Sequence, residues 1–172
     1  GKHYDGNIIT EAIGWKRQGK IDEAEFARIE NLADPCVGSC AMLGTANTMC
    51  SLAESLGLAL PGTAAIPAVM AARMEAGVRT GEAIMELVRR GITSKDILTH
   101  NTFENAMIHL LSMGGSTNGI LHLQAIYHEA GLGELELEAF DALIRQVPQV
   151  ASIYPASEHE IGRAHVRTPV TL

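Results

Sequence analysis

Residues 38–49 read GSCAMLGTANTM, which places one cysteine in a short polar turn that runs into a predicted helix. A thiolate at the start of a helix lies near the positive end of the helix dipole, which favours the ionised, metal-binding form. Cys40 is therefore a candidate ligand for a soft metal. The pattern is weak by itself, because most buried cysteines are structural and inert.

The chain contains three cysteines, an odd number that argues against a disulfide framework. Cys36, Cys40 and Cys50 lack the second close pair or the paired histidines of a self-contained zinc site. On these residues alone, three ordinary reduced thiols are the alternative to a metal site. Cys50 lies further along the predicted helix and is expected to contribute to packing. This cysteine content suits a reducing compartment, and we expect the cytoplasm.

Bulk composition favours a helical globular chain and excludes several classes of function. Of the 172 residues, 47% are hydrophobic but only 4% are aromatic, whereas strands enrich aromatic and β-branched residues. The formal net charge of −7 argues against binding to nucleic acid or to an anionic membrane surface. No uninterrupted apolar run approaches the ~20 residues of a membrane-spanning helix.

Periodicity and capping residues predict a series of helices. They cover residues 22–33, the segment from Cys40 to about 57, 67–76, 79–90, a segment starting at 101, 116–131 and 138–145. Residues 8–15 form a short amphipathic piece in an N-terminal loop, and Asn101 with Glu104 has the form of a capping box. Residues 150–154 are the best strand candidate. The expected fold class is therefore α/β and mostly helical.

A second polar motif, GGSTN, occupies residues 114–118. Two glycines allow the backbone to approach a ligand closely, and the free N–H groups of a helix start attract anions. A substrate carboxylate or phosphate would fit there, with the hydroxyls of Ser116 and Thr117 adding hydrogen bonds. The alternative is a helix break followed by an N-cap at one of these two residues, which needs no ligand.

The histidines are expected to be structural. His109, His122 and His128 lie in predicted helices beside apolar residues, where a hydrogen-bonded or partly exposed histidine is more common than a metal ligand. Glu104 has a sufficient role as the capping partner of Asn101.

Together, these motifs resemble the dihydroxy-acid dehydratase and 6-phosphogluconate dehydratase family, iron–sulfur hydro-lyases that convert hydroxy acids into 2-keto acids. The resemblance extends from about His3 to Ala156. It rests on the residues around Cys40 and on SLAESLGLALPG at 51–62, FENA at 103–106, GGSTN at 114–118, LHL at 121–123 and VP at 147–148. Residues 42–46, MLGTA, look closer to the sugar-acid dehydratases than to the branched-chain amino-acid enzyme.

The resemblance implies cofactors, a substrate class and site residues. It identifies Cys40 as one ligand of an iron–sulfur cluster, expected to be 2Fe–2S rather than 4Fe–4S, and leaves the role of Cys36 open. It makes Ser116, Thr117 and Asn118 candidates for substrate binding. In the family the cluster is a Lewis acid for a departing hydroxyl, Mg²⁺ orients the substrate, and a serine is the base. The implied substrate is a 2,3-dihydroxy acid or a sugar acid.

One cysteine cannot hold a cluster, and the family's other cluster cysteines, Mg²⁺ ligands and serine base have no match here. We therefore expect residues 1–157 to be a mostly helical fragment of the N-terminal α/β domain of a longer, homo-oligomeric enzyme, inactive when isolated. Residues 158–172 are expected to be a non-native tail, since 161–171 resemble an out-of-frame translation of a sequencing adapter. The alternative function is a stand-alone helical module that binds a small anion or a protein partner through residues 114–118.

Overall fold

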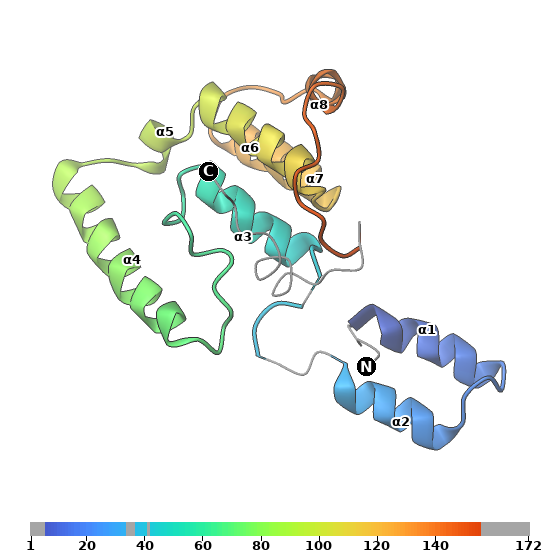
Figure 1. The fold of residues 1–172 in the computed structure, drawn as a ribbon. Helices are drawn as coiled ribbons and strands as arrows, with labels where there is room; N and C mark the ends of the chain where they lie inside the picture. The colour runs from blue at the N-terminus through green and yellow to red at the C-terminus, as the bar shows by residue number, and fades with distance from the viewer. Residues whose placement is uncertain (1–5, 34–36, 41, 156–172) are drawn as a thin grey trace.

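The computed structural model describes residues 6–33, 37–40 and 42–155. This part of the chain is built from helices joined by loops (Figure 1). The helices are α1 (Gly6–Arg17), α2 (Glu23–Leu32), α3 (Thr45–Ser55), α4 (Ala71–Arg90), α5 (Ser94–Ile97), α6 (His100–Met113), α7 (Asn118–Glu129) and α8 (Leu137–Ile144). The described residues contain no β-strand, so the predicted mostly helical character is confirmed while the α/β architecture stays a prediction.

Residues 150–154, which were predicted to be a strand, hydrogen-bond to the end of α6 and to the loop before α3. The backbone N–H groups of Val150 and Ala151 donate to the carbonyl of Ser112 in α6, at 2.7 and 3.3 Å. The carbonyl of Tyr154 accepts from the N–H of Leu43 at 2.8 Å. A strand needs a ladder of such bonds to a neighbouring strand. The strand prediction is therefore wrong.

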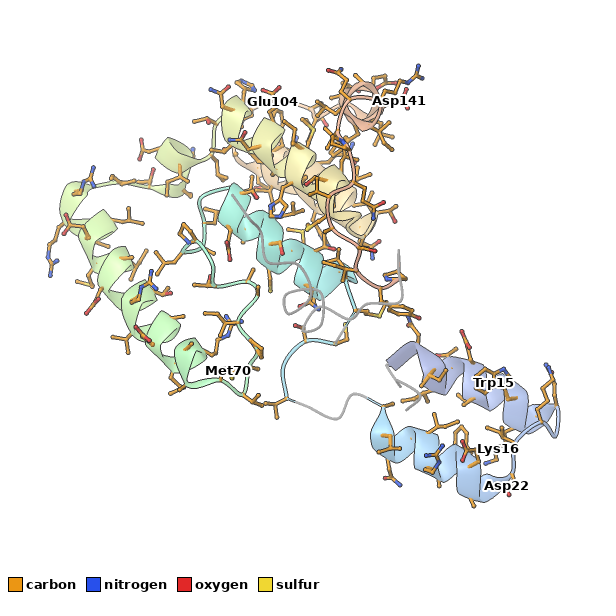
Figure 2. The ribbon with its side chains drawn as sticks, in the orientation of Figure 1. Trp15, Lys16, Asp22, Met70, Glu104 and Asp141 are labelled. Atoms are coloured by element: carbon orange, nitrogen blue, oxygen red, sulfur yellow. The ribbon has the colours of Figure 1, made fainter. Side chains whose placement is uncertain are left out.

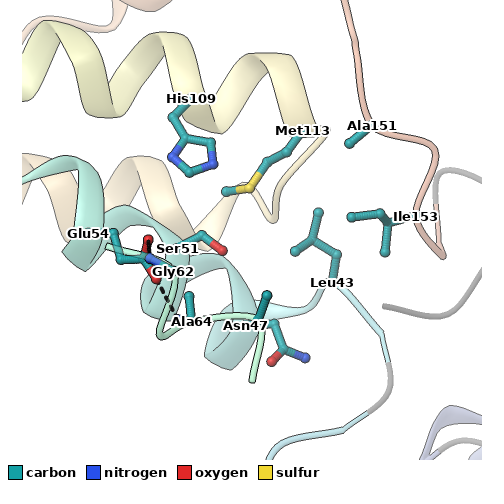
Figure 3. Close-up of a pocket in the computed structure, with 11 residues that line it drawn as sticks. Leu43, Asn47, Ser51, Glu54, Gly62, Ala64, His109, Met113, Ala151 and Ile153 are labelled. Atoms are coloured by element: carbon teal, nitrogen blue, oxygen red, sulfur yellow. Dashed lines mark hydrogen bonds between the residues drawn. The ribbon is translucent and has the colours of Figure 1, made fainter. Parts of the chain in front are cut away.

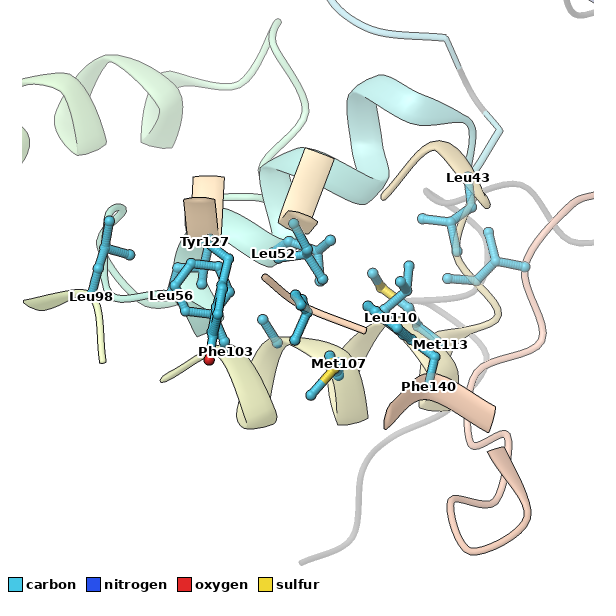
Figure 4. Close-up of a cluster of buried hydrophobic side chains, with 14 residues drawn as sticks. Leu43, Leu52, Leu56, Leu98, Phe103, Met107, Leu110, Met113, Tyr127 and Phe140 are labelled. Carbon is cyan, nitrogen blue, oxygen red and sulfur yellow. The ribbon is translucent and has the colours of Figure 1, made fainter. Parts of the chain in front are cut away.

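The hydrophobic core lies where α3, α6 and α7 pack together, with α8 against α6 (Figure 4). Helix α6 buries one face, because its apolar residues recur at helical spacing. These residues are Phe103, Ala106, Met107, Leu110 and Met113. The ring of Phe103 meets that of Tyr127 from α7 edge to face, with centroids 4.9 Å apart, a favourable aromatic geometry.

Helix α4 is one continuous helix, where the sequence predicted separate helices at 67–76 and 79–90. Gly77 and Gly81 lie inside it. An interior glycine costs roughly 1 kcal/mol relative to alanine but does not by itself end a helix. The helix ends at Gly91, as predicted, where a φ of 66° favours glycine.

Helix α6 begins one residue before the predicted capping box. Its N-cap is Thr99, whose side chain accepts from the N–H of Thr102, and the Thr102 hydroxyl accepts in return from the N–H of Thr99 at 2.9 Å. The predicted pair, Asn101 and Glu104, lies within the helix with both side chains exposed. The helix prediction is confirmed, but the capping role given to Glu104 is wrong.

Helices α1 and α2 pack against each other as a hairpin at the N-terminal end of the described chain (Figures 1 and 2). Lys16 links them, because its Nζ lies 2.6 Å from the Glu23 carboxylate and 4.5 Å from the centroid of the Phe26 ring. Asp22 caps α2 by accepting from the N–H of Glu25 at 2.8 Å. The predicted helix here is confirmed, whereas the preceding residues form a longer helix than expected.

Candidate functional site

Cys40 lies in a loop of bends before α3 and not at the start of that helix. Helix α3 begins at Thr45 with Gly44 as its N-cap. The helix dipole acts mainly within the first turn of a helix. The prediction that α3 stabilises the Cys40 thiolate therefore has no support. The thiol is half-buried, and its Sγ lies 4.0 Å from the carbonyl oxygen of Met42, a weak contact.

The side chain of Asn47, in the first turn of α3, fastens this loop. Its Nδ2 donates to the carbonyls of Cys40 and Met42, both at 2.6 Å, and its Oδ1 accepts from the hydroxyl of Ser39 at 2.7 Å. Asn47 is only 8% exposed. A buried carboxamide must find partners for its polar atoms, and this one finds all three in the cysteine loop.

The GGSTN motif forms the turn between α6 and α7 and docks on the start of α3. The N–H of Ser116 donates to the Thr48 hydroxyl at 3.0 Å, and Nδ2 of Asn118 donates to the Thr45 hydroxyl at 2.7 Å. The Ser116 hydroxyl accepts from the N–H of Asn118 at 3.3 Å. Thr117 takes the N-cap position of α7 without a side-chain cap bond. The structure therefore joins the two sequence motifs.

Glycines make this docking close. A Cβ at Gly115 would lie 2.7 Å from Leu110 Cδ1 and 3.1 Å from Thr48 Cγ2. A Cβ at Gly119 would lie 3.0 and 3.1 Å from the same two atoms. These distances are shorter than ordinary van der Waals contact, so the glycines let α7 approach α3. This packing role accounts for Gly115 without a ligand.

A cavity of about 320 Å³ opens between α3, α6, the loop at 62–65 and the segment at 151–153 (Figure 3). Asn47 and Leu43 form one side, next to the cysteine loop, and His109 lies on the wall from α6. Nδ1 of His109 hydrogen-bonds with the hydroxyl of Ser55 in α3. Burial lowers the pKa of His109 below its ordinary value, and the nearby Glu54 carboxylate opposes that shift.

A second cavity, of about 430 Å³, lies beside the GGSTN turn. Ser116 and Thr117 reach its edge, while Leu110, Ile120 and Val147 supply apolar walls. Ser116 is half-buried, whereas Thr117 and Asn118 are exposed. Substrate contact by these three residues stays a prediction, and two of them already bond to α3 or to each other.

Two further histidines and one further cysteine that the sequence singled out lie on α7 and α3. His122 and His128 are exposed on α7, and Nδ1 of His128 lies 3.1 Å from the Glu134 carboxylate. His109 is hydrogen-bonded, and His122 and His128 are exposed, as the sequence predicted; that none of the three binds a ligand stays a prediction. Cys50 is exposed, so its predicted packing role is wrong. Cys36 lies outside the described residues, which contain no group of three or more His, Cys, Asp or Glu able to hold a metal.

The Cys40 thiol has the chemistry of an iron–sulfur cluster ligand, and it can supply one ligand of several. Thiolates are the usual ligands of iron in such clusters because both partners are soft. Cys40 is a free thiol on a backbone segment that is tied down on both sides of the residue. A cluster takes about four protein ligands, so the described residues supply a part of such a site.

Comparison with known proteins shows the family that the chain matches. Residues 2–166 match the family described as dihydroxy-acid/6-phosphogluconate dehydratase, N-terminal. The dihydroxy-acid dehydratase of Citrifermentans bemidjiense is 50% identical over 149 residues, 87% of this chain and 27% of the relative. That of Halothermothrix orenii is 45% identical over 94% of this chain and 29% of its own length. That of Sulfolobus acidocaldarius is 45% identical over 88% of this chain and 27% of its own length.

The sequence thus matches the N-terminal region of a dehydratase family. The chain belongs to the dihydroxy-acid/6-phosphogluconate dehydratase family. It spans less than a third of the length of these curated relatives. The likeness of residues 42–46 to sugar-acid enzymes and the boundary at 157 stay predictions; residues 156–172 lie outside the described part. None of the described helices combines the length and apolarity needed to cross a bilayer.

Proposed function

We propose that this chain is part of a dehydratase that removes water from a 2,3-dihydroxy acid or a sugar acid to form a 2-keto acid. Cys40 supplies one thiolate ligand to the iron–sulfur cluster of that enzyme. The observation that supports the proposal is the Cys40 loop, which a buried side chain fastens in a chain that belongs to the dehydratase family.

When bound, an iron–sulfur cluster supplies a Lewis acid for the departing hydroxyl. The residues of this chain contribute ligation and positioning. The Cys40 thiolate binds one iron, and Asn47 holds the carbonyls of residues 40 and 42. Leu43, which is 2% exposed, anchors the far side of the loop through its N–H bond to Tyr154.

Substrate binding is assigned to the start of α7. The Thr117 hydroxyl is exposed and makes no cap bond, so it is the member of the GGSTN motif best placed to meet a carboxylate. Ser116 and Asn118 contribute indirectly, because their bonds to Thr48 and Thr45 hold this helix start in place.

The remaining assignments concern the longer polypeptide. We propose a 2Fe–2S cluster, with the other cluster cysteines, the Mg²⁺ ligands and the catalytic base contributed by residues beyond this chain. The whole enzyme is proposed to be a cytoplasmic homo-oligomer that binds neither nucleic acid nor membranes, in line with the net charge of −7. The isolated 172 residues are expected to show no turnover.

The test compares Cys40→Ser with Cys50→Ser in the full-length polypeptide that contains these residues. After anaerobic reconstitution, bound iron and sulfide are measured together with 2-keto acid formed from dihydroxy acids and sugar acids. We expect Cys40→Ser to lose the cluster and the activity. Cys50 is exposed on α3, so Cys50→Ser is the matched control and should retain both.

Full cluster occupancy in Cys40→Ser would contradict the ligand assignment. Failure of the unsubstituted protein to bind iron or to form any 2-keto acid would contradict the dehydratase itself. In that case the unsubstituted protein is titrated with inorganic phosphate and with small carboxylates. Binding of these anions would support the alternative of an anion-binding module.

A further inference from the structure

We propose that Asn47 is a positioning residue for Cys40, and that the GGSTN turn is the support that holds Asn47 in place. The inference rests on the proposed function only for the identity of what the thiol binds. The juxtaposition itself comes from three segments that the fold brings together: the cysteine loop, the first turn of α3 and the turn at 114–118.

The first step is the use that the structure makes of the Asn47 carboxamide. Both hydrogens of Nδ2 go to the carbonyls of Cys40 and Met42, and Oδ1 takes the hydrogen of the Ser39 hydroxyl. One side chain therefore fixes the residue before the cysteine, the cysteine itself and the second residue after it. At 8% exposure these bonds lie in a low-dielectric environment, where they are stronger and their loss costs more.

The second step is that few backbone hydrogen bonds hold the described residues of the loop. Its other contacts include the bond from Asn7 Nδ2 to Met42 Sδ at 3.3 Å and the close approach of Gly38 to Ala68, where a Cβ at Gly38 would lie 2.7 Å from Ala68 Cβ. Between described residues, the backbone bond that holds positions 37–43 is the one from the Leu43 N–H to the Tyr154 carbonyl. Residues 37–40, 42 and 43, the part of the loop that the structure describes, have no regular secondary structure. Because helical or strand bonds do not fix Cys40, its backbone position depends on a side chain from the next element.

The third step concerns the contacts that hold the first turn of α3, where Asn47 lies. Thr45 and Thr48 flank it on the same turn of α3, and both accept hydrogen bonds from the GGSTN turn, from Asn118 Nδ2 and from the Ser116 N–H. Thr48 is fully buried. The turn at 114–118 is thus bound to the turn of α3 that carries Asn47. This gives the GGSTN motif a role separate from any contact with substrate.

The fourth step is chemical. A metal ligand on a mobile loop must be ordered when the metal binds, whereas a pre-positioned thiol loses less entropy. Residues that orient ligands in this way tune metal affinity strongly in other metal sites, by about 10–100-fold. Asn47 acts on the backbone of Cys40 and not on its sulfur, so its effect is on geometry and availability of the thiol.

The main variant is Asn47→Asp, which keeps the shape but turns two donors into a carboxylate that faces two carbonyl oxygens. The matched control is Asn105→Asp, an exposed asparagine on α6. In the full-length apo protein, alkylation of Cys40 and of Cys50 is timed by site-resolved mass spectrometry. We expect Asn47→Asp to speed alkylation of Cys40 about tenfold while Cys50 is unchanged. Asn105→Asp should change neither rate.

A second pair of variants tests whether the bond between Ser116 and Thr48 supports Asn47. Thr48→Val removes the hydroxyl that accepts from Ser116 but keeps the shape, and Thr48→Ser restores the hydroxyl. We expect Thr48→Val to speed alkylation of Cys40 and Thr48→Ser to rescue the slow rate. A role limited to general stability would speed alkylation of Cys40 only as far as the free energy of unfolding falls, which urea denaturation of the same variants measures.

An acceleration at Cys40 that the measured loss of unfolding free energy fully accounts for, or no change at Cys40, would overturn the positioning role. Cluster content and the visible absorption spectrum of the reconstituted proteins are recorded in parallel, with a lower cluster yield expected for Asn47→Asp than for Asn105→Asp. If the alkylation rates separate as expected but even the unsubstituted protein binds no cluster, the proposed function fails while the positioning role stands.

Discussion

Helices α6 and α4 both carry regularly spaced apolar residues, but the structure uses the two sets in opposite ways. In α6, Phe103 is completely buried between α3 and α7. In α4, Met74 is 78% exposed and Val88 is 65% exposed. Among the described helices, α4 makes no extensive contact with another, and it stands apart from the core (Figure 1).

This contrast shows what stabilises each helix. Helix α6 gains from burial of one full apolar face, which is the main source of helix stability in proteins. Helix α4 depends more on local features, namely its left-handed end at Gly91 and the basic residues Arg89 and Arg90 in its last turn. Equal substitutions in the two helices should therefore have unequal consequences.

The largest difference is expected for side-chain truncation. Phe103→Ala should lower the free energy of unfolding by about 3–5 kcal/mol, because it removes a fully buried ring and leaves a cavity. Val88→Ala should change it by less than about 0.5 kcal/mol, since that side chain is mostly in water already. Urea denaturation measures both, and similar losses for the two would contradict the assignment of core and periphery.

The effect of a glycine-to-alanine substitution on the free energy of unfolding should have opposite signs in α7 and α4. At Gly119 in α7 the new Cβ would crowd Leu110, Thr48 and Leu52, so Gly119→Ala should destabilise by about 1–3 kcal/mol. At Gly81 in α4 nothing lies within 4 Å, so Gly81→Ala should stabilise by about 0.5–1 kcal/mol. Thermal unfolding gives both values, and a stabilising Gly119→Ala would show that α7 does not dock closely on α3.

The helix starts offer a smaller test. Thr99 caps α6 through its side chain, and Thr99→Ala should cost about 1 kcal/mol. Met70 holds the same position for α4 without a side-chain cap, so Met70→Ser should gain up to about 1 kcal/mol. The helical signal in circular dichroism, followed through thermal unfolding, reports both. No gain from Met70→Ser would mean that the start of α4 is already satisfied by other groups.

The smallest effect is expected from pH. Because burial lowers the pKa of His109, the folded chain favours the neutral ring, while the unfolded chain takes up a proton below about pH 6.5. The stabilising contribution is complete above that pH and is lost as the pH falls toward the lower folded value. His109→Asn should flatten this dependence between about pH 7 and 5.

The control is His122→Asn, an exposed histidine on α7. It should leave the pH dependence of unfolding as it is in the unsubstituted chain. A pH profile that His109→Asn does not flatten would show that burial of the His109 ring is not the source of the effect.

Much of the fold was predictable because it depends on neighbouring residues. The start of α2 and the end of α6 follow from local signals, the N-cap at Asp22 and the left-handed Gly114. The errors arose where a local signal competed with another. Asn101 and Glu104 fit the capping box as well as Thr99 does, and only the position of the helix decides between them.

The candidate site was predictable only in part. Cys40 and the GGSTN motif stand out by residue type, but the role of Asn47 left no sign in the sequence. Its bonds go to backbone carbonyls, which every residue has, so no residue pattern marks the partner. The strand expected near Val150 failed for a related reason, because a strand is defined by a partner that the segment does not contain.

The sequence alone determined most of the helices, the cysteine in a polar loop and the family, since these follow from local periodicity, caps and the order of motifs. Only the tertiary structure decided which apolar faces are covered and where the GGSTN turn points. Its bonds to Thr48 and Thr45 span 68 and 73 positions of chain. Contacts over such separations form when packing brings the helices together, and local propensity carries no information about them.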